Sequence, residues 1–101
     1  MIRLSVMYPN QPGTRFDWDY YMKSHIPAVK KLTPMGLVRV EVEKGIGSMQ
    51  PGAPAPYVCI AQLYYNSAED MQKCMASAPE LMADLPNFTN VQPQAQISEI
   101  L

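Results

Sequence analysis

Residues 57–65 read YVCIAQLYY, a run that is apolar at nearly every position apart from Gln62. A strand with this pattern is typical of the middle of a sheet, where both of its faces are covered. The segment 37–45 differs, because Val38, Val40 and Val42 alternate with charged or polar residues. Such alternation predicts an edge strand or a partly exposed strand.

The rest of the chain supplies two further strands and two helical regions. Asp17 is placed to cap a helix that runs to about Leu32 and closes before Pro34-Met35-Gly36, and Pro27 predicts a kink just past His25. The Gly- and Pro-rich segment 46–56 predicts an irregular connection of the kind often used over a pocket. The other elements are expected at 2–8 and 93–101 for strands, 67–78 for a helix, and 79–85 for a short second helix.

The order β-α-β-β-α-β defines the fold class as α+β. It predicts a ferredoxin-like, four-stranded antiparallel sheet with two helices on one face, formed by a single domain over residues 1–101. Right-handed crossovers place the first and third strands at the centre. Because the central strands look apolar on both sides, a second copy is expected to cover the helix-free face, which gives a homodimer.

Composition narrows the function classes. Charged residues make up only 17% of the 101 residues, the net charge is −1, and the eight basic residues are scattered. This composition gives no footprint for nucleic acid or for an anionic membrane. The amino terminus has no signal-peptide pattern, so cytoplasmic residence is expected. Cys59 and Cys74 lack a metal or redox spacing and are expected to be buried thiols, and neither a metal nor a cofactor is expected.

His25 is the single histidine of the chain. On a helical wheel it lies within the apolar stripe of the first helix, beside Trp18, Tyr21 and Met22. Burying an imidazole costs free energy unless its nitrogens are hydrogen-bonded, so a pocket or a dedicated partner should face it. Two interpretations remain open. His25 acts as a general base or acid on a substrate, or it is a structural residue bonded to a backbone carbonyl freed by Pro27.

Several further side chains are candidates around His25. Tyrosine hydroxyls on the strands could orient a substrate oxygen, although such residues are more often core, and methionines could form an adaptable lining. Asp17 is interpreted as a cap and Asp84 as a surface carboxylate. The residues expected to bind substrate are Tyr8, Trp18, Tyr21, Met22, Val29, Tyr64, Met82 and Phe88, with His25 as the catalytic residue.

Short motifs along nearly the whole chain resemble the EthD family, named for ethyl tert-butyl ether degradation. The specific part is Asp-x-x-Tyr-Tyr-x-x-x-His-x-Pro, which runs from Asp17 to Pro27. The Asn-Phe and strand patterns would be weak alone. The full set comprises Tyr8-Pro9-Asn10, Arg15-Phe16-Asp17, Asp19-Tyr20-Tyr21, His25, Pro27, Gly36-Leu37, Pro56-Tyr57, Pro86-Asn87-Phe88-Thr89-Asn90 and Ile97-Ser98-Glu99.

The resemblance implies a dimeric α+β barrel with a small apolar cavity between sheet and helices in each subunit. It also implies that His25 is functional, with Tyr21 and Asp17 as companions. Two functions remain open. One is a cofactor-independent catabolic enzyme of the isomerase, dehydratase or oxygenase type, which acts by proton transfer on a small apolar or aromatic metabolite. The other is a non-catalytic ligand-binding or accessory protein that uses the same cavity. A haem held by His25 is a minor alternative.

Overall fold

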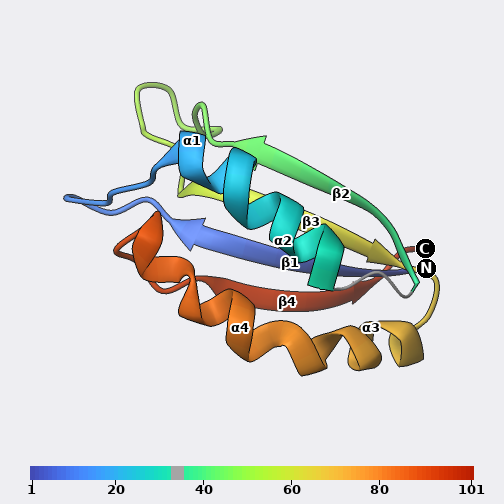
Figure 1. The fold of residues 1–101 in the computed structure, drawn as a ribbon. Helices are drawn as coiled ribbons and strands as arrows, with labels where there is room; N and C mark the ends of the chain where they lie inside the picture. Colours follow the sequence, from blue (N-terminus) through green and yellow to red (C-terminus); the bar gives the residue numbers. More distant parts are fainter. Residues whose placement is uncertain (33–35) are drawn as a thin grey trace.

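The computed structural model describes residues 1–32 and 36–101, and they form one antiparallel sheet with helices on one side (Figure 1). The stop signal expected at Pro34 and Met35 lies outside the described residues. The strands are β1 (Ile2–Pro9), β2 (Leu37–Lys44), β3 (Tyr57–Tyr65) and β4 (Gln94–Glu99). The helices are α1 (Trp18–Tyr20), α2 (Ile26–Leu32), α3 (Ala68–Cys74) and α4 (Ala78–Ala83), with a π-helical turn at Tyr21–His25 and 3-10 turns at Met75–Ser77 and Leu85–Asn87.

The sheet order is β2-β3-β1-β4, so β1 and β3 are central and β2 is an edge strand. This order confirms the predicted ferredoxin-like topology. The register is antiparallel throughout, and it places Val6 between Ala61 of β3 and Ala95 of β4. Alternate residues of each strand therefore face the helices together, which builds one apolar layer between sheet and helices.

The buried core lies between this sheet face and the helices, and it has two neighbouring parts. Around Leu4, the first cluster joins Leu63 and Tyr65 of β3 to Met71 and Cys74 of α3. Around Tyr8, the second cluster is largely aromatic and includes Tyr21 and Phe88. The first cluster therefore lies at the Leu4 end of β1, and the second lies at the Tyr8 end.

The helix-free face of the sheet is more polar than expected. The prediction that both faces of the central strands are apolar is wrong for Ser5, which lies on this face beside Gln62, the polar exception noted in the sequence, and near charged side chains of β2. Ser5 donates a hydrogen bond to Gln62, and Gln62 donates to Glu43 at 3.4 Å. These side chains satisfy one another within the chain, so their burial needs no apolar neighbour.

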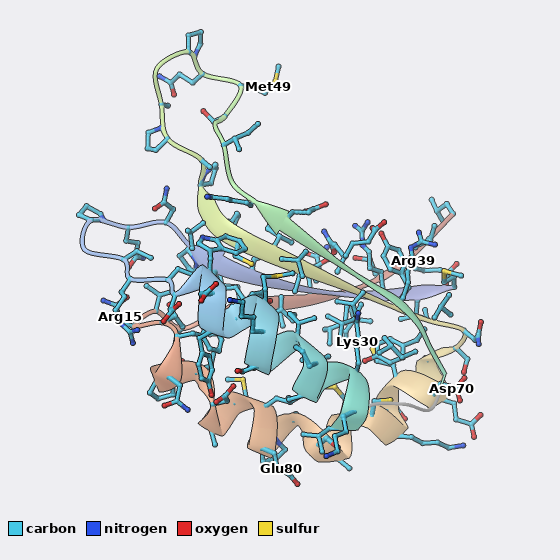
Figure 2. The ribbon with its side chains drawn as sticks, turned by 45° about the horizontal axis from the view of Figure 1, so that its top comes forward. Arg15, Lys30, Arg39, Met49, Asp70 and Glu80 are labelled. Atoms are coloured by element: carbon cyan, nitrogen blue, oxygen red, sulfur yellow. The ribbon has the colours of Figure 1, made fainter. Side chains whose placement is uncertain are left out.

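Residues 46–56 form a loop that projects away from the body of the molecule, with Met49 near its tip (Figure 2). Ile46 and Met49 are 97% and 99% exposed. The structure describes the whole loop, and none of its residues lines the main cavity. The predicted irregular connection is confirmed, although the loop does not border this cavity. Among the described residues, no helix combines the length and the apolar character needed to cross a bilayer.

Candidate functional site

The first helical region begins next to a segment far away in the sequence. Asp17 caps it as predicted, since its carboxylate accepts a hydrogen bond from the Tyr20 backbone N–H at 3.1 Å. The Asp17 backbone N–H donates to the Phe88 carbonyl at 2.7 Å, and the Thr89 hydroxyl donates to the Arg15 carbonyl at 2.7 Å. These bonds hold the segment after α4 against the start of α1, and so bring two distant parts of the chain to one site.

A π-helical turn then orients His25. The Ile26 N–H bonds to the Tyr21 carbonyl, five residues earlier, which is the wide spacing of a π turn. The distortion therefore lies before Pro27, at residues 21–25, and not just past His25 as predicted. Such turns occur frequently at functional sites. His25 is only 6% exposed; its ring stacks on Tyr21 with centroids 5.4 Å apart and lies 4.6 Å from the Phe88 ring.

Asp84 is the partner of His25. Its Oδ2 lies 2.9 Å from Nδ1 of the imidazole, while its Oδ1 accepts hydrogen bonds from the Tyr20 hydroxyl at 2.6 Å and from the Asn87 amide at 2.8 Å. The interpretation of Asp84 as a surface carboxylate is wrong, because its side chain is only 23% exposed and is held by these three partners. The expected backbone carbonyl partner of His25 is also replaced by this side chain.

The arrangement assigns the two imidazole nitrogens different roles. An ionised carboxylate only accepts hydrogen bonds, so it favours the tautomer with the proton on Nδ1. Nε2 then carries a lone pair. Among the residues that the structure describes, no hydrogen-bond partner of this Nε2 is present. A neutral imidazole held in this way is ready to accept a proton at Nε2.

Hydrogen bonding keeps Asp84 ionised. Partial burial raises the pKa of the Asp84 carboxyl, but the hydrogen bonds from Tyr20, Asn87 and His25 outweigh this effect, and the pKa is lowered from its ordinary value of 3.8. The carboxylate is therefore charged at neutral pH, which is the state that orients the His25 ring.

This lowered pKa predicts how stability depends on pH. Because the folded-state pKa lies below the unfolded value, the contribution of Asp84 to the free energy of unfolding is complete above about pH 4 and is lost as the pH falls further. Urea titrations of the wild type and of Asp84→Asn should show the wild type more stable at about pH 6, with the difference shrinking at about pH 3. A difference that stays constant between these conditions would contradict the assignment.

A cavity of about 190 Å³ lies between the sheet and the helices, and His25 forms part of its wall. Its other lining residues are almost all apolar or aromatic. They come from β1, the first helical region, β3, the helices from α3 to α4, and the start of β4. A concave apolar site with a few polar groups is the usual form of a small-molecule site. The lining includes Leu4, Val6, Tyr8, Tyr21, His25, Val29, Leu63, Cys74, Met75, Leu81, Met82 and Ala95.

The structure brings His25 and four of the predicted binding residues to this cavity, namely Tyr8, Tyr21, Val29 and Met82. The other four predicted residues, Trp18, Met22, Tyr64 and Phe88, do not line it. The cavity wall is therefore apolar and aromatic, as predicted, but only half of the predicted binding residues contribute to it.

Four predicted wall residues are corrected by their contacts. Trp18 packs on Phe16 at 4.7 Å, outside the cavity, and Met22 is half-exposed on the outer side of its helical turn. Phe88 is fully buried and supports the His25 ring without reaching the cavity. Tyr64 lies on the helix-free face, where its hydroxyl donates to Glu41 at 2.7 Å. Tyr64 cannot reach the cavity because a strand turns alternate side chains to opposite faces of the sheet.

A buried polar cluster lies beside the His25 end of the cavity. Burial is the main cause that raises the pKa of Tyr8 and of Tyr21, whose hydroxyls hydrogen-bond to each other. Burial likewise raises the pKa of the Cys59 thiol to about 12, although a hydrogen bond with Tyr21 lowers it in part. Both phenols therefore stay neutral and retain their O–H groups. Cys59 stays a thiol, in agreement with its predicted inert role.

Sequence reasoning missed the three residues that complete the His25 site. Asp84, Tyr20 and Asn87 are joined to one another by hydrogen bonds, yet from the sequence Tyr20 and Asn87 were identified only as parts of motifs. One feature of the sequence could have indicated Asp84. The family motif Pro86-Asn87-Phe88-Thr89-Asn90 begins two residues after it, and this motif segment packs against the motif that begins at Asp17. Among the described residues, no three His, Cys, Asp or Glu side chains group as metal ligands.

Together, the fold and the site define a small ferredoxin-like α+β protein with an apolar cavity and one imidazole–carboxylate pair in contact with it. The EthD domain model matches residues 13–92. The chain belongs to the EthD family. The matched range includes His25, Asp84 and the helices between them, while β1 and β4 lie outside it.

Solved structures with the same fold include EthD proteins from bacteria. An EthD-like protein from Ralstonia eutropha JMP134 has a TM-score of 0.90 and 36% identity, over 97% of this chain and 89% of that one. An ethyl tert-butyl ether degradation family protein from Bacillus halodurans C-125 has a TM-score of 0.69 and 22% identity, over 100% and 99% of the two chains. HapK from Hahella chejuensis shares the fold at 18% identity, with a TM-score of 0.61 over 100% and 93%. No curated protein matches the chain.

Proposed function

We propose that this protein is a cofactor-independent enzyme that moves a proton on a small apolar carbonyl compound, with His25 as the general base. The observation that carries the proposal is the 2.9 Å contact between Asp84 and Nδ1 of His25, on the wall of an apolar cavity. A carboxylate that orients an imidazole and stabilises its protonated form is the arrangement used by catalytic histidines in acyl transfer. Isomerisation, dehydration and reaction of a carbanion with oxygen all begin with such a proton transfer.

The proposed step balances within the site. The C–H bond next to the carbonyl breaks, the proton goes to Nε2 of His25, and the electron pair of that bond forms an enolate. Asp84 stabilises the resulting imidazolium, while a neutral tyrosine hydroxyl at this end, from Tyr8 or Tyr21, donates a hydrogen bond to the enolate oxygen. The proton then returns to the same carbon or to another. A substrate that fills the apolar cavity displaces water from it, which strengthens each of these electrostatic interactions.

Hydrogen–deuterium exchange tests this proposal without knowledge of the natural substrate. The protein is incubated in D₂O with 2-pentanone, 2-heptanone or acetophenone, and loss of the α-proton signal is followed by ¹H NMR. We expect exchange faster than in buffer for at least one of these ketones, because exchange requires only the proposed base. Binding of the ketones without any faster exchange would contradict an enzyme and favour a ligand-binding or accessory protein.

We also propose that two copies pack through the helix-free face of the sheet. Nε of Arg3 is buried without a hydrogen-bond partner in the described part of the chain, which is a costly state for a cation. The same face carries Arg39 together with Glu41 and Glu43, so it is complementary to a copy of itself. A carboxylate of the second copy would supply the acceptor that Arg3 lacks.

Light scattering should return twice the monomer mass at micromolar concentration. Ile60→Asp should shift the protein to monomer, because Ile60 pairs with Met7 near the middle of this face and an unpaired charge buried there is costly. Ile46→Asp, on the exposed loop, is the matched control and should leave the mass unchanged. A wild-type monomer would contradict the proposed packing.

A further inference from the structure

The cavity is elongated along β1. Leu4, Val6 and Tyr8 all line it, and they are alternate residues of one strand. Four residues of strand span about 13 Å. Because only about 190 Å³ is spread over this length, the cavity is narrow. A space of this shape suits a single polymethylene chain better than a fused ring system.

His25 lies at one end of this space. The aromatic cluster around Tyr8 and Tyr21 surrounds the imidazole, whereas the opposite end, around Leu4, is formed mainly by aliphatic residues, with Tyr65 and Cys74. The His25 imidazole and the tyrosine hydroxyl assigned to the reaction are therefore both at the Tyr8 end. A ligand with its carbonyl at His25 must place its apolar part toward Leu4.

The cavity opens to solvent between α4 and β4. Met75 and Met82 line it and are nevertheless 42% and 47% exposed, and Ala95 of β4 lines it from the opposite side. Ile97 lies two residues after Ala95, on the same face of β4 and opposite Leu4 in register, and it is 57% exposed. We call this apolar strip, made of Met75, Met82, Ala95 and Ile97, the α4–β4 groove. Its Met75 and Ile97 part continues the cavity at the apolar end, because Ile97 pairs with Leu4 and Met75 follows Cys74.

We propose that the substrate is a single-chain amphiphile, with an enolisable carbonyl head at His25 and a straight apolar chain that is too long for the cavity and lies with its distal part in the α4–β4 groove. This inference rests on the proposed function for its head group. A cavity of about 150 Å³ holds benzene, so about 190 Å³ holds about seven or eight non-hydrogen atoms. That is the size of 2-hexanone or 2-heptanone, and every further methylene must enter the groove.

The homologous 2-alkanones from 2-pentanone to 2-undecanone test the proposal. Their dissociation constants can be measured from the shifts of the His25 ring signals, which are unambiguous because the chain has one histidine. Within the cavity, each added methylene should tighten binding about fourfold. Beyond 2-heptanone the gain should continue at about twofold per methylene, since the groove is half-exposed. Affinity that levels off or falls beyond 2-heptanone would overturn the proposal.

Two variants locate the effect. In Ile97→Asp, the ratio of the dissociation constants of 2-heptanone and 2-undecanone should fall from about 16 to about 1, because a charge replaces the floor of the groove. Met75→Gln should reduce the same ratio, and it covers the case in which Ile97→Asp folds poorly. Ile46→Asp is the control, since this equally apolar and exposed residue lies on the distant loop, and it should leave the ratio unchanged. A wild-type ratio in both groove variants would overturn the proposal.

The α-proton exchange assay on the same samples separates this proposal from the previous one. Chain-length-dependent binding without exchange would contradict the catalytic role of His25 and leave the groove supported. Exchange of 2-pentanone with no gain from longer chains would support His25 and overturn the groove.

Discussion

Replacing His25 by Gln is expected to lower the rate of α-proton exchange by about 10²–10⁴-fold, the usual contribution of a general base. The Gln side chain can still donate a hydrogen bond to Asp84, so the fold and the hydrogen bonds of Tyr20 and Asn87 are expected to persist. The loss is therefore expected in the exchange rate, measured by ¹H NMR in D₂O, and only to a small extent in the melting temperature.

Met22→Gln is the matched control for this variant. Met22 lies on the same helical region, is half-exposed and does not line the cavity, so its replacement should leave the exchange rate unchanged. If His25→Gln instead lowers the melting temperature and leaves exchange intact, His25 is a structural residue. In that case the lost interaction should cost about 1–3 kcal/mol of stability.

Asp84→Asn should lower the exchange rate by about 10²–10⁴-fold while retaining the shape of the side chain, since the corresponding change in a Ser-His-Asp triad costs about 10⁴. The neutral amide can donate to Nδ1 as well as accept from it, so it no longer selects one imidazole tautomer. Asp19→Asn is the control. This carboxylate is exposed and pairs with Lys23 at 3.1 Å, away from the cavity.

The tautomer itself can be observed. His25 is the single histidine, so its ¹⁵N ring shifts report directly on which nitrogen carries the proton. We expect the proton on Nδ1 in the wild type and a shift toward Nε2 in Asp84→Asn. A wild-type protein with the proton on Nε2 would contradict the role of Asp84, whatever the exchange rates are.

Local sequence patterns predicted most of the fold. Residue alternation in 37–45 and the apolar run at 57–65 predicted an edge strand and a central strand, and both are confirmed by the sheet order. Asp17 was correctly assigned as a cap, because a cap depends on residues three positions apart. Alternation also places Tyr64 on the same face as Gln62, away from the cavity-lining Leu63 and Tyr65, so the strand pattern itself excludes Tyr64 from the cavity.

The sequence by itself determined the element order and the inward direction of His25, which follow from periodicity within single segments. It also determined the topology, which follows from that order together with right-handed crossovers. Only the tertiary structure decided what His25 contacts. Asp84 lies 59 positions away along the chain, and it reaches the imidazole because backbone hydrogen bonds hold Phe88 against Asp17. The cavity also depends on how the helices lie over β1 and β4. Periodicity assigns a side chain to a face, whereas its partner on that face is determined by packing between distant segments.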